Sequence, residues 1–158
     1  MKNLRTEKAG TLLVGIGNSG RKDDGLGWKF AGLVSESANS FIDCEYRYQL
    51  QVEDVLMTCR YDKIIFVDAT HEVLEDGYEL KPCRVAPHYY YSSHMQSPET
   101  ILYLAKELYN KEPDAFTLAI TGKQWGLGTS LSPEAERNLQ KAWSFFEKEL
   151  FQHVRITA

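Results

Sequence analysis

The sequence has few of the features that would place a chain at once in a specialised class. Its three cysteines, Cys44, Cys59 and Cys83, are odd in number and lack CxxC spacing, so we expect neither a disulfide framework nor a thiolate zinc site. No run approaches the ~18–20 consecutive apolar residues needed to span a bilayer. The first eight residues are polar and the apolar run after them is short. We therefore expect no signal peptide, no membrane insertion and a cytoplasmic protein.

Charge of one sign is also lacking. The chain carries 22 acidic and 18 basic residues, for a net charge of −4, and the two signs are interspersed. This pattern has no basic stripe for nucleic acid, so we expect no nucleic-acid partner. The length of 158 residues suits one domain, and we expect residues 1–158 to form a single globular domain.

What is present is an alternation of short apolar runs with helical patterns, which is typical of a three-layer α/β fold. Strands are predicted over 11–16, 41–49, 63–68, 78–85 and 115–120, and helices over 25–37 and 53–59 and from Ser97 and Ser132 onward. The continuous apolar run at 64–67 indicates a strand covered on both faces, as in a parallel sheet. Pro82 removes a ladder donor and places its strand at a sheet edge.

Two helix starts are marked by an N-cap serine followed by proline, at Ser97-Pro98 and Ser132-Pro133. In the first of these helices we expect a buried stripe, made of Ile101, Leu104, Ala105 and Leu108.

Ligands of open α/β sheets bind beyond the carboxyl ends of the strands, and this rule selects three places. They are the loop after the first strand, with Asp23 and Asp24, the acid Asp68 after the third strand, and the loop holding His88 and His94. Helix capping explains either Asp23 or Asp24 equally well when each is taken alone. We interpret His71, His88 and His153 as structural.

The first loop also matches G-x-G-x-x-G through Gly15, Gly17 and Gly20. This pattern makes a nucleotide- or phosphate-binding protein the alternative hypothesis. Against it, the helical pattern begins only after Asp24, and two carboxylates stand where a phosphate needs positive potential.

Asp24, Asp68 and His94 can converge at one edge of the sheet. Two carboxylates and a neutral imidazole with open positions suit a first-row divalent cation such as nickel or zinc. Without thiolates, such a site would grip the cation only transiently.

These motifs, taken together, resemble those of the hydrogenase maturation protease family, endopeptidases that trim the C-terminus of the large subunit of nickel–iron hydrogenases. The matching segments follow one another in the family's order: Gly15-Ile16-Gly17-Asn18, Asp23-Asp24-Gly25-Leu26-Gly27, Val67-Asp68-Ala69, Ser92-Ser93-His94 and Leu131-Ser132-Pro133. Two features mark a divergent branch. The segment from Tyr48 to Asp54 stands where many members have a Gly-Gly-Thr turn, and the first loop carries the basic Arg21 and Lys22.

The resemblance implies that Asp24, Asp68 and His94 are both the catalytic and the metal-contacting residues. It implies no permanent cofactor, because the nickel arrives with the large-subunit precursor; cadmium or zinc are expected to substitute in vitro. It also implies a twisted, mostly parallel five-stranded sheet with one antiparallel edge strand between helical layers. A relative that binds the subunit without cutting it is a further hypothesis, which the intact Asp24, Asp68 and His94 disfavour.

The sequence contains no credible Ser/His/Asp or Cys/His set and no H-E-x-x-H motif. The remaining mechanism is attack by water, with a carboxylate as base and a metal ion or an acid polarising the scissile carbonyl. We also expect the segment Gly122–Gly128 to be a mobile loop that helps to hold the substrate peptide, because it is rich in glycine.

Overall fold

The computed structural model describes residues 10–37, 41–89 and 96–157. Its elements in chain order are β1 (Thr11–Ile16), the 3-10 turn η2 (Lys22–Gly25), α1 (Leu26–Glu36), β2 (Ile42–Arg47), α2 (Asp54–Thr58), β3 (Lys63–Thr70), β4 (Tyr78–Pro82), α3 (Pro98–Tyr109), β5 (Asp114–Thr121) and α4 (Pro133–Thr157). Each predicted strand and helix is present. Among the described residues, no helix is long and apolar enough to cross a membrane.

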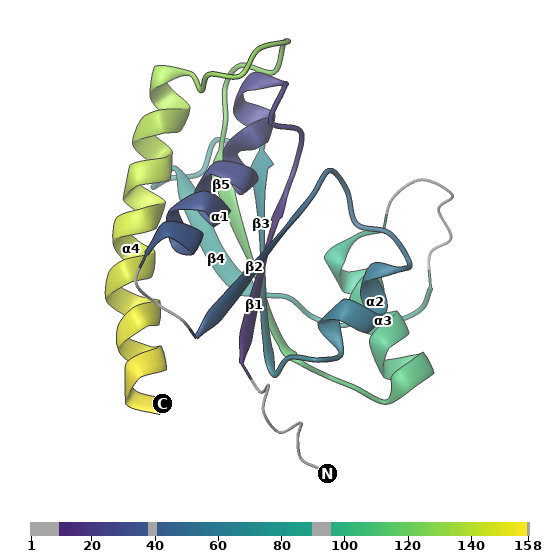
Figure 1. Cartoon of the computed structure of the whole chain (residues 1–158). Coiled ribbons are helices and arrows are strands. Elements are labelled where there is room, and N and C mark those ends of the chain that lie inside the picture. Colours follow the sequence, from purple (N-terminus) through teal and green to yellow (C-terminus); the bar gives the residue numbers. More distant parts are fainter. Residues whose placement is uncertain (1–9, 38–40, 90–95, 158) are drawn as a thin grey trace.

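One five-stranded sheet lies between two helical layers, as predicted. The strand order is β2-β1-β3-β5-β4. The pairs β1–β2, β1–β3 and β3–β5 are parallel, and β4 runs antiparallel to β5 at the edge. Figure 1 shows α1 and α4 on one face of the sheet and α2 and α3 on the other.

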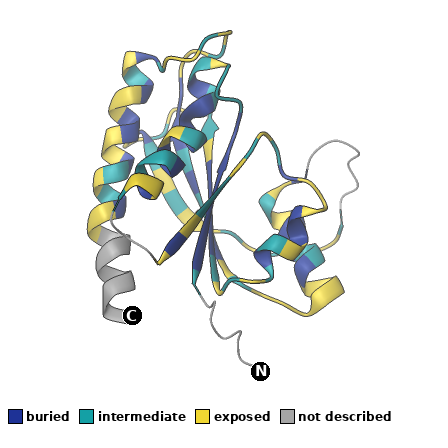
Figure 2. Ribbon diagram, in the orientation of Figure 1, coloured by how far each residue is buried: buried dark blue, intermediate teal, exposed yellow. Residues whose placement is uncertain are grey.

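Alternate residues of the strands feed two separate cores. On one face Leu13, Ile65 and Val67 pack with Phe30 of α1 and Phe146 of α4. On the other face the core contains Leu12, Val14, Ile64 and Phe66 of the sheet with Ile101 of α3. The buried central strands stand out between the two helical layers in Figure 2. A continuous apolar run such as 64–67 is therefore required, because both of its faces are covered.

Both predicted helix starts are confirmed. Ser97 Oγ accepts a hydrogen bond from Thr100 N at 3.1 Å, and Ser132 Oγ accepts one from Ala135 N at 3.1 Å. The predicted stripe of α3 is wrong at Leu108, which is 61% exposed, whereas Leu102 is buried. The last turn of α3 is exposed all round, so Leu108 has no layer to pack against.

The third strand is longer than predicted, and this lengthening positions Asp68. β1 pairs with β3 only as far as Val67 of β3, whereas β5 pairs with β3 as far as Thr70. The first strand stops because the chain turns away at Gly17, whose φ of +136° is accessible to glycine and disfavoured for other residues. Asp68 therefore lies inside β3, beside the space that β1 has left.

Helix α1 approaches the sheet closely through Gly27. A Cβ at Gly27 would lie 2.5 Å from the carbonyl oxygens of both Ile16 and Val67. Backbone atoms of two strands cannot easily yield, so this contact requires glycine.

We predict that Gly27→Ala lowers the free energy of unfolding by about 2 kcal/mol, through overpacking. The matched control is Gly32→Ala on the same helix, where nothing lies within 4 Å of the added Cβ. That variant should be as stable as the wild type or more stable, because alanine favours helix. Urea unfolding measures both, and equal stabilities of the two variants would contradict the close contact.

Candidate functional site

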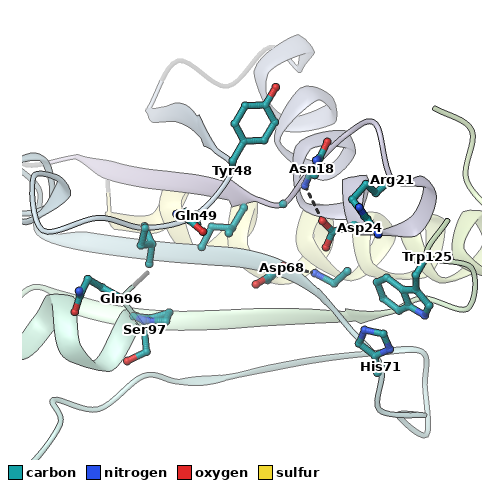
Figure 3. Close-up of a pocket in the computed structure, with 15 residues that line it drawn as sticks. Asn18, Arg21, Asp24, Tyr48, Gln49, Asp68, His71, Gln96, Ser97 and Trp125 are labelled. Carbon is teal, nitrogen blue, oxygen red and sulfur yellow. Dashed lines mark hydrogen bonds between the residues drawn. The ribbon is translucent and has the colours of Figure 1, made fainter. Parts of the chain in front are cut away.

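A cavity of about 580 Å³ opens at the carboxyl ends of β1, β2 and β3 (Figure 3). Its apolar wall includes Ile16 and Leu50. Polar and aromatic side chains line the rest: Asn18, Arg21, Asp24, Tyr48, Gln49, Asp68, His71, Gln96, Ser97 and Trp125. Segments far apart in the sequence thus meet here, at the edge of the sheet where α/β folds bind ligands.

Asp24 reaches the cavity from the 3-10 turn η2. Its Oδ2 accepts a hydrogen bond from Asn18 N at 2.9 Å, which fixes the carboxylate against the preceding loop. That loop is tightly packed, because a Cβ on Gly17 would overlap the carbonyl oxygen of Asp24. Asp24 is therefore held on one side and open to the cavity on the other.

Asp68 faces the same cavity from β3 (Figure 3). Its Oδ1 accepts a hydrogen bond from Ala69 N at 2.8 Å. The side chain of Asp68 is exposed, but it is exposed inside the cavity. The protein atoms around the cavity therefore displace much of the water that would otherwise hydrate this carboxyl group. This burial raises the pKa of Asp68 to about 7; the bond from Ala69 opposes the rise, and the negative charge of Asp24 adds to it. Asp68 can therefore exchange a proton near neutral pH.

Asp23 has a different role from Asp24, although sequence patterns alone do not distinguish the two acids. It is fully buried, and its carboxylate accepts hydrogen bonds from Lys123 N, Gln124 N, Ser132 N and Ser132 Oγ at 2.7–2.8 Å. Burial alone would raise the pKa of Asp23, but these bonds outweigh it and lower the pKa below its usual value. Asp23 thus stays ionised and joins η2 to the segment before α4.

The third predicted ligand, His94, lies outside the described residues. The structure brings together Asp24 and Asp68, two of the three predicted residues. Within the ranges described above, no group of three His, Cys, Asp or Glu side chains is placed to hold a metal ion.

His71, interpreted as structural from the sequence, lines the cavity. Its ring stacks on Trp125 with the centroids 3.8 Å apart and the planes 21° from parallel. The sequence feature that could have placed His71 at the cavity is its position three residues after Asp68, at the same carboxyl edge of the sheet.

Trp125 belongs to the glycine-rich segment 122–128, which was expected to be mobile. Hydrogen bonds to η2 and the first loop tie this segment down: Gln124 O and Gly128 O accept from Asp23 N and Lys22 N, and Gly128 N donates to Gly20 O. These bonds connect the segment to Asp23 and its neighbours, partners that glycine content does not reveal, and the mobility of the segment stays a prediction. Trp125 lies at the cavity, and the contact of this segment with a substrate peptide stays a prediction.

The glycine loop offers few donors to a phosphate. Seven of the eight backbone N–H groups from Gly17 to Asp24 donate to acceptors within the chain, namely those of Gly17, Asn18, Gly20, Arg21, Lys22, Asp23 and Asp24. Phosphate loops depend on free N–H groups. The geometry thus disfavours the nucleotide alternative and assigns the glycines to packing.

The fold is that of hydrogenase maturation proteases. The endopeptidase HybD of E. coli matches with a TM-score of 0.69 at 12% identity, over 91% of this chain and 93% of its own. The maturation protease HycI of Thermococcus kodakarensis matches with a TM-score of 0.66 at 19% identity, over 89% and 92%. A hydrogenase 2 maturation peptidase from a Thaumarchaeota archaeon gives 0.64 at 19% identity, over 89% and 97%.

No family model matches the chain, and no curated protein matches it. Since all three structural identities are below 20%, the similarity shows a shared fold.

We predict that the carboxyl group of Asp68 titrates near pH 7 in the folded protein. In Asp24→Asn the midpoint should fall, because a like charge is removed, and should stay above the ordinary value of about 4, because burial is the larger cause. Carbon-13 NMR of labelled aspartate measures both midpoints. A wild-type midpoint near 4, or one unmoved by Asp24→Asn, would contradict this account of the site.

Proposed function

We propose that the protein is an endopeptidase that removes the C-terminal extension of a nickel–iron hydrogenase large-subunit precursor after nickel insertion, in the cytoplasm. The observation that carries the proposal is the pair Asp24 and Asp68, which come from separate segments and face one cavity. The shared fold with hydrogenase maturation proteases supports it.

In this proposal the nickel is part of the substrate, and the cavity recognises it there. Carboxylate oxygens and an imidazole are suitable ligands for a first-row divalent ion. Asp68, with a pKa of about 7, can give up its proton when such an ion arrives at neutral pH. The third ligand in the proposal is His94, which precedes the cavity residue Gln96 by two positions in the chain.

For the hydrolysis we propose attack by water on the scissile carbonyl carbon. A carboxylate of the site takes one proton from the water as the new C–O bond forms. The C–N bond then breaks, and the leaving amine receives the proton.

The cysteines offer no competing nucleophile. Burial is the largest cause that raises the pKa of the Cys44 thiol to about 11 and that of Cys83 to about 12, and it raises the pKa of Cys59 as well. Thiols of this kind are protonated at neutral pH and unreactive.

Asp24→Asn should reduce processing of a nickel-loaded precursor by at least about 100-fold, since it removes the negative charge while keeping the shape of the side chain. Its amide oxygen can still accept the bond that Asn18 N donates, so the free energy of unfolding should change by less than about 1 kcal/mol. The mass of the subunit's C-terminus measures cleavage. Asp62→Asn, an exposed acid at the opposite end of β3, is the matched control and should process normally. A folded and fully active Asp24→Asn enzyme would falsify the assignment.

Recognition through nickel predicts a second result. The wild type should cut nickel-loaded precursor and leave nickel-free precursor intact, because Asp24 and Asp68 contact the substrate through its ion. Parallel digests of the two precursor forms, followed by mass spectrometry, make the comparison. Equal cleavage of both would remove the gating role and leave a peptidase that recognises its substrate by other contacts.

A further inference from the structure

Three aromatic side chains, here called the aromatic platform, lie beside the acid cavity: Trp28 of α1, Tyr46 of β2 and Tyr48 just after β2. Trp28 and Tyr48 stack with their centroids 5.2 Å apart and their planes at 25°. Tyr46 meets Trp28 edge to face, at 5.3 Å and 65°. The three rings thus form one continuous contact group.

Hydrogen bonds fix the platform to the loop that carries Asp24. Trp28 Nε1 donates to the carbonyl oxygen of Arg47 at 3.0 Å, and the same oxygen accepts from Gly17 N at 3.0 Å. The guanidinium of Arg47 is held in turn, since its Nε donates to Asp54 Oδ1 at 2.9 Å. Trp28, against which both tyrosine rings pack, is therefore held in place before any ligand arrives, which lowers the entropic cost of binding to it.

The platform is open to solvent in spite of this order. Tyr48 is 66% exposed and Tyr46 36%. Tyr48 lines the acid cavity (Figure 3), whereas Trp28 and Tyr46 line a second hollow of about 420 Å³. Leu33 and Gly32 contribute the apolar part of that hollow, and Lys29 and Glu36 contribute opposite charges. The platform therefore connects the two hollows.

We propose that the aromatic platform is a subsite for an apolar side chain of the polypeptide substrate, and that Tyr48 is a specificity-determining residue. The inference rests on the proposed function and extends it. Because Tyr48 lines the cavity that holds Asp24 and Asp68, a polypeptide whose metal-bearing part occupies that cavity can contact Tyr48 where it leaves. Ordered, exposed tyrosine and tryptophan rings are the side chains that most often dominate the binding of protein ligands, and Leu33 with Gly32 favours an apolar group in the second hollow.

The test is the steady-state processing of nickel-loaded precursor by Tyr48→Ala, Tyr48→Phe and Tyr109→Ala. Tyr48→Ala should raise KM by about tenfold and leave kcat within about twofold, as expected when a binding contact remote from the reacting atoms is lost. Tyr48→Phe keeps the stacked ring and should restore the wild-type KM. Tyr109→Ala makes the same substitution at an exposed tyrosine (44%) at the far end of α3, and should behave as the wild type.

The outcomes separate the two proposals. If the wild type cuts the precursor and Tyr48→Ala has an unchanged KM, the subsite is overturned and the peptidase stands. A fall in kcat alone, or a raised KM that Tyr48→Phe does not restore, also overturns it. A wild type that cuts no nickel-loaded precursor overturns the proposed function and the subsite together. Circular dichroism of each variant checks that the substitutions at Tyr48 and Tyr109 leave the protein folded.

Discussion

The buried carboxylate of Asp23 is the contact on which the rest of the site depends. It accepts four hydrogen bonds from Lys123, Gln124 and Ser132, residues that follow it by 100 positions or more. Bonds to an ionised acceptor are stronger than neutral ones, and Ser132 also caps α4. The turn that holds Asp23 therefore cannot move independently of the end of β5 or the start of α4. Because Asp24 is the next residue, its direction into the cavity follows from this anchor.

Two adjacent acids thus divide the work, and Asp68 completes the arrangement from another strand. Asp23 is ionised, enclosed and fully bonded. Among the described residues, only Asn18 N donates a hydrogen bond to the side chain of Asp24. Asp68 occupies the place that β1 leaves open when the chain turns at Gly17. Packing and charge therefore produce a cavity with two acids from unrelated segments.

The helix starts, the edge strand and the two cavity acids could be predicted from local sequence. Ser97 and Ser132 predict the starts of their helices, because capping depends on a few adjacent residues. Pro82 predicts an edge strand, because its missing N–H donor is a local property. The rule of carboxyl ends selected Asp24 and Asp68. The role of Asp23, the stacking of His71 on Trp125 and the exposure of Leu108 depend on contacts between distant segments. No local pattern encodes these contacts, so the sequence could not reveal them.

The central proposal is that Asp24 and Asp68 bind the same cation. Anomalous diffraction from crystals soaked in cadmium tests it directly, without any assumption about the substrate. The account predicts an anomalous peak in the cavity, bonded to carboxylate oxygens of both residues, which disappears in Asp68→Ala. A peak on Asp24 alone, or a cavity without cadmium while other surface sites are filled, would contradict it.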